Sequence, residues 1–486
     1  MAEILFTHSY FYKFDQKQWR TKQPYPPLGT IQAAAYLRKN GFDVDLFDTN
    51  LRDDPREIGP YLQSNPPKYL VIYDDGFNYL SKMCLTKMRD AAMVMAKEGK
   101  EAGCIVMISS SDATDHYEKY LNHDADYIIR GEGEQTLLEL ILALKSNTDE
   151  STVQGLALIK NQNIIVTPNR SVKQNLDEFP LAAWDLVDIS SYEKIWREHH
   201  KYFSINLATT RGCPFKCNWC AKPIYGNRYN SRSPRHVVEE IKLLLGRYNP
   251  DHFWMADDIF GLKPGWVQEF RDLVVESKLK FRYKIQSRVD LLLQEDTVDA
   301  LKQSGAETVW VGAESGSQKI LNDMDKGTTV EQIYAATRLL QQKGIKVGFF
   351  LQFGYLGETQ KDIDATIKML LDLMPDEAGI SVSYPLPGTK FYDKVRDQLE
   401  EKQNWTDSAD LAMMFHGTFH GDYYRMLHQY VHSLYRSRRG IKMFEKLWHT
   451  PLQITSKDLK SGLASFYFTA RSFTLNKKLS KLRQPT

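Results

Sequence analysis

The sequence is poor in several features that mark particular classes of protein. It has only five cysteines among 486 residues, too few for the disulfide framework of a small secreted domain, and no apolar run near the roughly 18 residues that cross a bilayer. A net charge of +2 provides no overall field that would attract nucleic acid. The first residues read as a strand and not as a signal peptide. We therefore expect a cytoplasmic protein without a nucleic-acid partner.

The chain is long enough for two or three domains, and its 42% hydrophobic and 26% charged residues are typical of globular proteins. Residues 1–148 alternate short β-rich segments with longer helical patterns, which predicts a doubly wound parallel sheet. Residues 149–195 read as a connector with a hairpin. Six further β/α units at residues 196–400 predict a partial barrel with its site at the carboxyl ends of the strands. Residues 401–486 are predicted to be mainly helical, so the fold class is α/β with a helical C-terminal region.

Three of the five cysteines lie in one short loop. Cys213, Cys217 and Cys220 occur in the sequence Thr-Arg-Gly-Cys-Pro-Phe-Lys-Cys-Asn-Trp-Cys, directly after a strand-like segment. Thiolates at this spacing suit three irons of a [4Fe–4S] cluster, whose fourth iron then has no protein ligand. A zinc site with His236 as the nearest fourth ligand is an alternative, and so is a disulfide with a spare thiol. The pattern favours the cluster.

The CxxxCxxC spacing, with Trp219 just before the last cysteine, resembles the signature of the radical S-adenosylmethionine (SAM) superfamily. The resemblance implies a [4Fe–4S] cluster bound by Cys213, Cys217 and Cys220, whose open iron chelates the amino and carboxylate groups of SAM. It further implies that an electron from a donor such as flavodoxin or ferredoxin cleaves SAM to a 5′-deoxyadenosyl radical.

Successive predicted strands of the barrel end in polar motifs that match SAM-contacting positions of this superfamily. The second strand ends at Asp257, which the resemblance assigns to the SAM amino group, although acidic residues also cap helices. Arg288 suits a carboxylate because its guanidinium binds two oxygens at once, and Glu314 suits the ribose hydroxyls. The other matched positions at the ends of the third, fourth and fifth strands are Gln286, Ser287, Ser315, Gln352 and Tyr355.

The N-terminal region resembles the cobalamin-binding fold that precedes the barrel in one branch of the superfamily, which contains proteins similar to the anaerobic magnesium-protoporphyrin IX monomethyl ester cyclase. The matching segments are residues 24–29 (Pro-Tyr-Pro-Pro-Leu-Gly), 109–114 and 130–134. The resemblance implies cobalamin as a further cofactor. The residues that it places around the corrin are His8, Ser110, Ser111, Gly131 and Glu132.

Two features separate the chain from other cobalamin and radical SAM proteins. It has no Asp-x-His, the pattern whose histidine ligates cobalt in cobalamin mutases and methionine synthase. We therefore expect no cobalt–histidine bond, His8 included, and a domain that has lost the vitamin remains an alternative. Cys84 and Cys104 lie in separate segments and cannot build the auxiliary cluster that methylthiotransferases carry.

The resemblance implies an enzyme that functionalises an unactivated carbon of a small-molecule substrate. With cobalamin bound, the expected reaction is C-methylation that consumes two SAM molecules per turnover. An oxidative ring closure like that of the cyclase is the alternative reaction. A non-catalytic binding protein on the same fold is the alternative from another class.

The C-terminal region carries two further patterns. In residues 413–420, one interpretation makes His416 or His420 an acid or base in catalysis. The favoured interpretation is a buried stripe of methionine and aromatic side chains with both histidines on the surface. From Arg436 onward, basic residues outnumber acidic ones around the aromatic run at 466–468. Peripheral contact with an anionic membrane is one interpretation, but the sequence favours an ordinary solvated helical tail that packs through its aromatic side chains.

Overall fold

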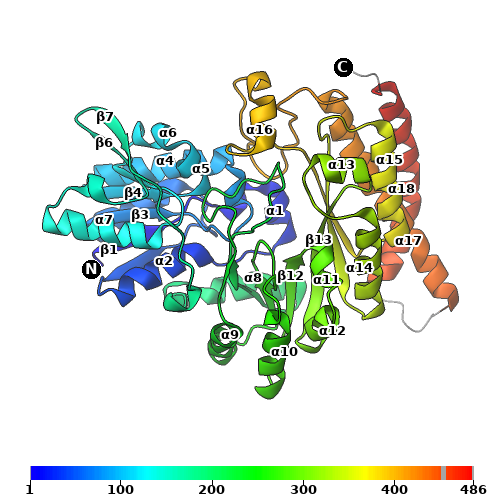
Figure 1. Ribbon diagram of the computed structural model, residues 1–486, viewed down its shortest axis with the longest axis horizontal. Coiled ribbons are helices and arrows are strands. Elements are labelled where there is room, and N and C mark those ends of the chain that lie inside the picture. The colour runs from blue at the N-terminus through cyan, green and yellow to red at the C-terminus, as the bar shows by residue number, and fades with distance from the viewer. Residues whose placement is uncertain (1, 450–455, 484–486) are drawn as a thin grey trace.

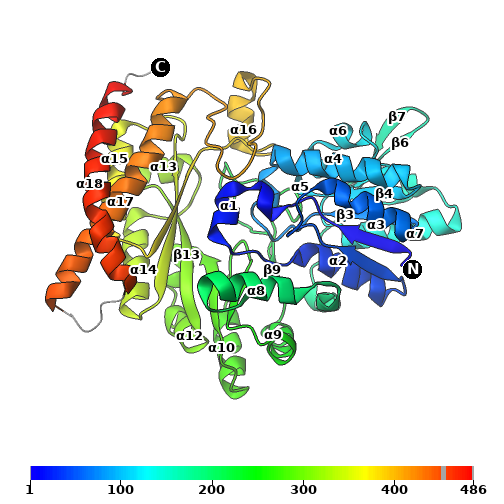
Figure 2. The same ribbon diagram turned by 180° about the vertical axis from the view of Figure 1, so that it is seen from behind.

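The computed structural model describes residues 2–449 and 456–483, with the side chains of residues 443–458 left aside. Two α/β domains lie side by side, and two long C-terminal helices flank the second domain on the side away from the first (Figures 1 and 2). The fold class predicted from the sequence is therefore the one that the structure has.

The N-terminal domain is a seven-stranded sheet with helices on both faces. The strand order is β2-β1-β3-β4-β5-β6-β7; the first five strands are parallel, and the hairpin of the predicted connector continues the sheet antiparallel at one edge. The strands are β1 (Ile4–Thr7), β2 (Val44–Phe47), β3 (Tyr69–Tyr73), β4 (Ile105–Ser109), β5 (Tyr127–Ile129), β6 (Leu156–Lys160) and β7 (Asn163–Val166). Burial of β1, β3 and β4 on both faces explains their near-continuous apolar sequences.

Two separate layers of apolar side chains hold these helices to the sheet. One layer joins the sheet to α2 (Leu28–Lys39) and α7 (Glu134–Ser146). The other joins it to α3 (Ile58–Ser64), α4 (Thr86–Glu101) and α6 (Tyr117–Leu121). A sheet wound on both faces binds ligands at the carboxyl ends of its strands, which here point toward the second domain.

The second domain is a partial barrel of six parallel strands in sequence order. The strands are β8 (Ser204–Leu207), β11 (His252–Met255), β12 (Arg282–Ser287), β13 (Ala306–Glu314), β14 (Lys346–Phe353) and β15 (Glu377–Val382). The helices that cover the outer face of the sheet are α9 (Pro234–Tyr248), α10 (Trp266–Glu276), α12 (Thr297–Gln303), α14 (Val330–Gln342) and α15 (Gln360–Leu373). A short ribbon of β9 (Thr210–Arg211) and β10 (Asn230–Ser231) leaves the end of β8.

The C-terminal region is helical, as predicted, with α17 (Gly421–His449) and α18 (Ser456–Lys481). In the segment before α17, Phe415 and Phe419 are buried while His416 and His420 are exposed. The interpretation of this segment as a buried stripe with surface histidines is therefore confirmed.

The expected packing of the tail through its aromatic side chains holds for Phe468 alone, which is half-buried with the Arg436 guanidinium of α17 5.3 Å from its ring centroid. Phe466 and Tyr467 of the same run are exposed, and so is Phe473 about two turns further along. Small residues, with Leu475 and Leu479, take most of the buried face of α18 instead.

The start of α2 explains the Pro-Pro-Leu-Gly sequence. Pro27 precedes the helix and offers no side-chain cap, so Asp75 at the end of β3 accepts hydrogen bonds from the backbone N–H groups of Leu28 (3.1 Å) and Gly29 (3.0 Å). A Cβ atom on Gly29 would lie 2.9 Å from Oδ1 of Asp75. Glycine is therefore required for the carboxylate to reach the helix end.

The same segment joins the two domains. Tyr25 packs on Trp254 of β11 with ring centroids 4.8 Å apart, and its hydroxyl lies 3.1 Å from Oγ of Ser204. Asn206 of β8 donates from Nδ2 to the carbonyl of Pro26 at 3.0 Å. The N-terminal domain thus closes the open edge of the barrel beside β8.

We predict that Gly29→Ala lowers the free energy of unfolding by about 1–3 kcal/mol, because the new methyl group displaces Asp75 from the helix end. The matched control is Gly246→Ala in α9, where an added Cβ meets no atom within 4 Å. Alanine should stabilise that helix by up to about 1 kcal/mol. Urea unfolding of both variants measures the difference, and equal stabilities would contradict the role given to Asp75.

Candidate active site

Three free thiols lie in the loop between β9 and β10, at the carboxyl end of β8. Cys213 is buried, and Cys217 and Cys220 are partly buried. Burial, with a smaller contribution from the charges of Cys217 and Cys213, raises the pKa of Cys220 to about 12. A loop of this kind brings together the three sulfur donors that the sequence predicts.

The donor set fits a cluster better than a single ion. Within the described parts of the chain, no three His, Cys, Asp or Glu side chains are grouped so that they could hold one metal ion. A [4Fe–4S] cluster does not need such a group, because each thiolate bonds a separate iron atom. Three cysteines would then leave one iron without a protein ligand.

Asn218, between the second and third cysteines, anchors this loop through all its polar groups. Its backbone N–H donates to the carbonyl of Met324 (3.0 Å), and Nδ2 donates to the carbonyl of Asp323 (2.6 Å). Its Oδ1 accepts from the hydroxyl of Tyr355 (2.6 Å), and its carbonyl accepts from the N–H of Phe391 (2.9 Å). The sequence analysis missed Asn218, because only the cysteines around it form a recognisable pattern.

These partners come from separate parts of the barrel. Met324 and Asp323 lie at the end of α13 (Gln318–Asp323), and Phe391 lies in α16 (Lys390–Val395). Tyr355 follows β14 and stacks on Phe391 with ring centroids 5.2 Å apart. The predicted cofactor residue Tyr355 therefore supports the cysteine loop; contact with SAM stays a prediction.

Arg288, at the end of β12, joins the cysteine loop to the turn after α13. Its guanidinium lies 3.6 Å from the ring centroid of Phe215, between the first two cysteines. It donates to the carbonyl of Lys326 at 2.9 Å and pairs with Asp290 at 3.0 Å. The predicted SAM-carboxylate residue thus lies against the loop, with most of its N–H groups already bonded.

Glu314 ends β13 in a conformation that non-glycine residues seldom adopt. Its φ of 54° is left-handed, and the strand register shifts between Gly312 and Glu314. The Nζ atom of Lys326 donates to Oε1 of Glu314 at 2.7 Å, and both side chains are buried. Backbone strain of this kind collects at functional sites, which agrees with the predicted site at this strand end.

Lys326 connects this carboxylate to the cysteines. Burial lowers the pKa of Lys326, but attraction by Glu314 and by the Cys217 thiolate outweighs burial and raises it. A Cβ atom on Gly312 would lie 2.5 Å from Nζ of Lys326, so the ammonium occupies the space that the glycine leaves. The sequence gives no local signal for this role, because 12 residues separate the partners.

Asp257 is buried and bonded to the strand where the cysteine loop begins. Its Oδ1 accepts from the N–H groups of Thr209 (2.7 Å) and Thr210 (2.8 Å), and Oδ2 accepts from the Thr209 hydroxyl (2.6 Å). Burial raises the pKa of Asp257 to about 6. Asp257 does not cap the next helix of the outer layer, because α10 begins at Trp266 with Gly265 at the N-cap position. Binding of the SAM amino group stays a prediction.

The other residues predicted to bind SAM differ in their surroundings. The hydroxyl of Ser315 lies 3.0 Å from that of Thr366, and Gln352 donates to Oγ of Ser383 at 3.0 Å. Ser287 is buried and Gln286 partly buried on opposite faces of β12. Trp219 packs beside Tyr355, and its indole N–H has no partner among the described residues.

Aromatic rings and a partly buried cation lie on the central strands of the barrel. The rings of Trp310 and Phe350 are tilted with centroids 4.7 Å apart. Nζ of Lys284 lies 5.1 Å from the ring centroid of Tyr25 and 5.0 Å from that of Trp254. Burial lowers the pKa of Lys284 to about 8.

Arg211 ties the cysteine loop to the N-terminal domain. It stands two residues before Cys213 and donates to Oε1 of Glu132 and to Oε1 of Glu134, each at 2.6 Å. All three side chains are buried. Burial lowers the pKa of Arg211, but the carboxylates outweigh it, so the guanidinium stays charged. The Arg-Gly-Glu-Gly-Glu sequence therefore docks the cysteine loop; contact of Glu132 with cobalamin stays a prediction.

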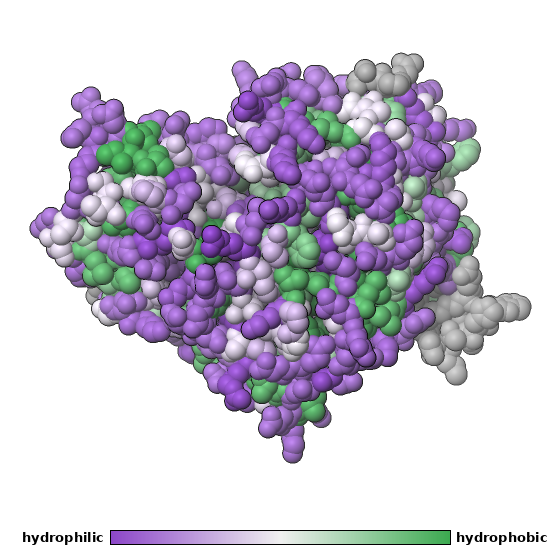
Figure 3. All heavy atoms as spheres, in the orientation of Figure 1, coloured by the Kyte–Doolittle hydropathy of each residue, from purple (hydrophilic) through white to green (hydrophobic). Residues whose placement is uncertain are grey.

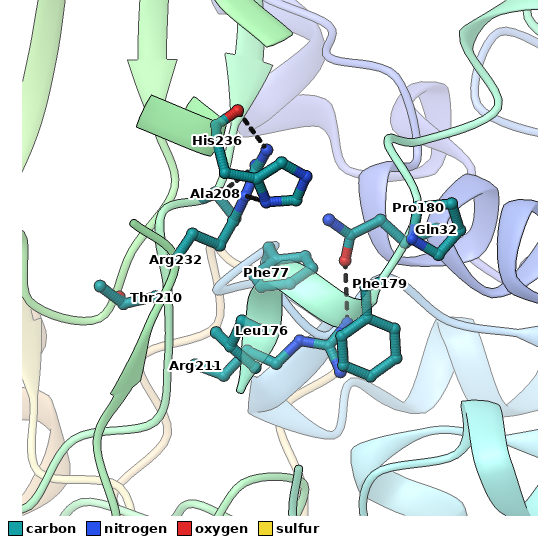
Figure 4. A pocket seen from close by; sticks show the side chains of 10 residues that line it. All are labelled: Gln32, Phe77, Leu176, Phe179, Pro180, Ala208, Thr210, Arg211, Arg232 and His236. Atoms are coloured by element: carbon teal, nitrogen blue, oxygen red, sulfur yellow. Dashed lines mark hydrogen bonds between the residues drawn. The ribbon is translucent and has the colours of Figure 1, made fainter. Parts of the chain in front are cut away.

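A small hollow lies beside this contact (Figure 4). Its walls include Gln32, which accepts from Arg211 at 2.9 Å, and Phe179, whose ring lies 4.2 Å from the guanidinium. The volume is about 10 Å³, which is close to that of one water molecule. A substrate cannot enter it.

The residues predicted around the corrin are engaged within the N-terminal domain. Nε2 of His8 lies 2.9 Å from Oδ1 of Asp48, and Nδ1 of His8 lies 3.1 Å from Oγ1 of Thr49. The Ser110 hydroxyl caps α5 (Ser111–Asp115), so Ser111 opens that buried helix. Gly131 has a left-handed φ of 73° and donates from its N–H to Thr114. Their contact with cobalamin stays a prediction.

Three buried polar atoms lack partners at the edge where cobalamin is expected. They are the hydroxyl of Tyr10 after β1, Oδ1 of Asn50 after β2 and the hydroxyl of Ser81 after β3, each without a hydrogen bond among the described residues. Unpaired buried groups cost free energy unless a ligand or water satisfies them. These three atoms come from segments that follow adjacent strands, on the edge of the sheet where a doubly wound fold binds ligands.

Comparison with known proteins agrees with this architecture. Residues 207–370 match the radical SAM superfamily. An uncharacterized methyltransferase of Pyrococcus horikoshii is 30% identical over 283 residues, which are 58% of this chain and 60% of that protein. The anaerobic magnesium-protoporphyrin IX monomethyl ester cyclase of Rubrivivax gelatinosus is 26% identical over 393 residues, covering 78% of this chain and 69% of that protein. The chain thus spans about two thirds of these relatives.

Two solved structures share the fold. The cobalamin-dependent S-adenosylmethionine radical enzyme OxsB superposes with a TM-score of 0.74 at 17% identity, covering 98% of this chain and 72% of that one. The radical S-adenosylmethionine methyltransferase TsrM of Kitasatospora setae superposes with a TM-score of 0.68 at 18% identity, covering 82% and 75%. These likenesses confirm the predicted fold: an N-terminal sheet domain followed by a partial barrel.

We predict that Arg211→Gln destabilises the chain by about 3–5 kcal/mol, because it leaves two buried carboxylates without a cation. The control is Arg38→Gln, which removes an exposed pair with Asp185 and should cost less than about 1 kcal/mol. Urea unfolding measures both variants. If Arg211→Gln is as stable as Arg38→Gln, the double ion pair does not hold the domains together.

Proposed function

This chain belongs to the radical SAM superfamily through its domain at residues 207–370, and we propose that it is an enzyme. Its proposed reaction functionalises an unactivated carbon of a small molecule. The observation that carries the proposal is the loop of three free thiols at the carboxyl end of β8. Cys213, Cys217 and Cys220 would hold three irons of a [4Fe–4S] cluster, which would supply the electron for reductive cleavage of SAM.

The residues around the loop would orient this reaction. Asn218 and Arg288 hold the loop from two directions, which limits the positions that the cluster can take. Glu314 accepts from Lys326 through Oε1 and lies at the end of β13, where its other carboxylate oxygen would accept from the ribose hydroxyls of SAM. The strand ends thus offer both a rigid support for the cluster and acceptors for the cofactor.

We propose that the N-terminal domain holds cobalamin, which would supply a methyl group to the substrate. The support is the three unpartnered polar atoms in the segments after β1, β2 and β3, because the carboxyl ends of these strands are the ligand-binding edge of such a fold. The structures of OxsB and TsrM that share this fold are described with cobalamin bound. Both ring nitrogens of His8 have partners within the domain, so we do not assign His8 to cobalt.

C-methylation is therefore the proposed reaction, and oxidative ring closure is the second candidate because the similar cyclase covers 78% of this chain. The two reactions leave different products. Methylation yields S-adenosylhomocysteine and a substrate heavier by one methyl group, whereas ring closure oxidises the substrate without S-adenosylhomocysteine. Anaerobic turnover with a chemical reductant and analysis of the SAM-derived products separates them.

We predict that Cys217→Ala loses iron after anaerobic reconstitution, whereas the parent binds about four irons per chain. Cys104→Ala is the control, since that buried thiol lies in the N-terminal domain and bonds to the carbonyl of Pro67. It should keep the iron of the parent. Iron analysis and the EPR spectrum of the reduced protein with SAM measure both variants. If Cys217→Ala retains the parental iron content, the cluster assignment is wrong.

We predict that Tyr10→Phe weakens binding of hydroxocobalamin about fivefold to tenfold, since the hydroxyl would lose a hydrogen bond of about 1 kcal/mol. Tyr69→Phe is the matched control, because Tyr69 also has an unpartnered buried hydroxyl but stands at the amino end of β3. Absorbance titration measures both affinities. If Tyr10→Phe and Tyr69→Phe change the affinity equally, hydroxocobalamin does not bind at the strand ends. If the parent cleaves SAM but binds no corrin, the cobalamin part of the proposal is wrong and the radical SAM part stands.

A further inference from the structure

Small residues line much of the buried face of α18. This face carries the small buried residues Gly462, Ser465 and Ser472, together with Leu475 and Leu479 nearer the end of the helix. A Cβ atom on Gly440 of α17 would lie 2.5 Å from Cβ of Ser465, so the two helices are in close contact. A helix on a globular protein normally turns its large apolar residues inward. In α18 only the C-terminal half does so.

Five other large apolar residues of α18 are exposed. We call them the outer stripe: Leu459, Leu463, Phe466, Tyr467 and Phe473, which are 49%, 74%, 69%, 60% and 63% exposed. Their spacing of three, four and seven residues places them along one side of the helix. A contiguous apolar surface of this kind marks a site that another surface covers.

The charges beside the outer stripe have one sign. Residues 459–483 contain no Asp or Glu, and the exposed cations among them are Lys460, Arg471, Lys477, Lys478, Lys481 and Arg483. Nζ of Lys477 lies 4.5 Å from the ring centroid of Phe473. The whole chain has a net charge of only +2, so this helix is a local concentration of positive charge.

The position of α18 leaves the outer stripe accessible. The helix lies at the far edge of the molecule, with α17 and the barrel between it and the N-terminal domain (Figures 1 and 2). Most of the face shown in Figure 3 is hydrophilic. A flat partner can therefore approach α18 without meeting the cysteine loop.

We propose that the outer stripe docks the protein on the surface of an anionic lipid bilayer, with α18 lying in the plane of the interface. The apolar side chains would enter the boundary between headgroups and acyl chains, and the flanking cations would meet anionic headgroups. A second copy of the chain fits less well, because two outer stripes would bring the cations of both helices together. No helix in the described parts of the chain is both long and apolar enough to span a bilayer.

Flotation of the full-length protein with vesicles tests this proposal. We expect binding to vesicles that contain phosphatidylglycerol and little binding to vesicles of phosphatidylcholine alone. The double variant Leu463→Gln/Phe473→Gln should lower the partition coefficient at least about tenfold, because two large apolar side chains no longer enter the lipid. The control is Val275→Gln, a change at an equally exposed apolar residue on α10.

A second variant separates charge from apolar contact. Lys477→Glu/Lys478→Glu should weaken binding to the anionic vesicles, and added salt should weaken binding of the parent. Circular dichroism and the iron content of each variant report whether the fold is intact. Absence of vesicle binding, or equal binding by parent and Leu463→Gln/Phe473→Gln, overturns the proposal. So does a dimer in sedimentation that this double variant dissociates, which would make the outer stripe a contact between copies.

Discussion

The double ion pair of Arg211 is the contact on which the rest of the active site depends. Two carboxylates of the N-terminal domain hold a side chain that stands two residues before the first cysteine of the cluster loop. Burying three charges costs solvation free energy, and only a close geometry offsets that cost. The contact therefore restrains the relative position of the two domains, and it keeps the carboxyl ends of the N-terminal strands directed toward the domain that carries the thiols.

The residues around the thiols act mainly on the loop itself. Asn218 bonds to the end of α13, and Tyr355, which follows β14, donates a hydrogen bond to Asn218. Arg288 bonds to the turn between α13 and α14. Several of these positions are ones that the superfamily resemblance assigns to SAM. One side chain can serve both purposes, because the cofactor and the cluster meet at the same strand ends.

The C-terminal helices lie on the side of the barrel away from the N-terminal domain, whereas the cysteine loop faces that domain. Small residues allow α17 and α18 to approach closely, so only Leu475 and Leu479 among the large aliphatic side chains of α18 are buried while five large apolar residues stay exposed. Docking through α18 would leave the contact between the two domains undisturbed.

The sequence by itself determined the features that depend on neighbouring residues. The spacing of Cys213, Cys217 and Cys220 predicts the cluster loop, and the alternation of strand and helix patterns predicts both α/β domains, because hydrophobic period and ligand spacing are local. Only the tertiary structure decided the pairing of Arg211 with Glu132, 79 residues away, and the four bonds of Asn218. It also decided the outward face of α18, since burial depends on which neighbour a helix meets and not on its composition.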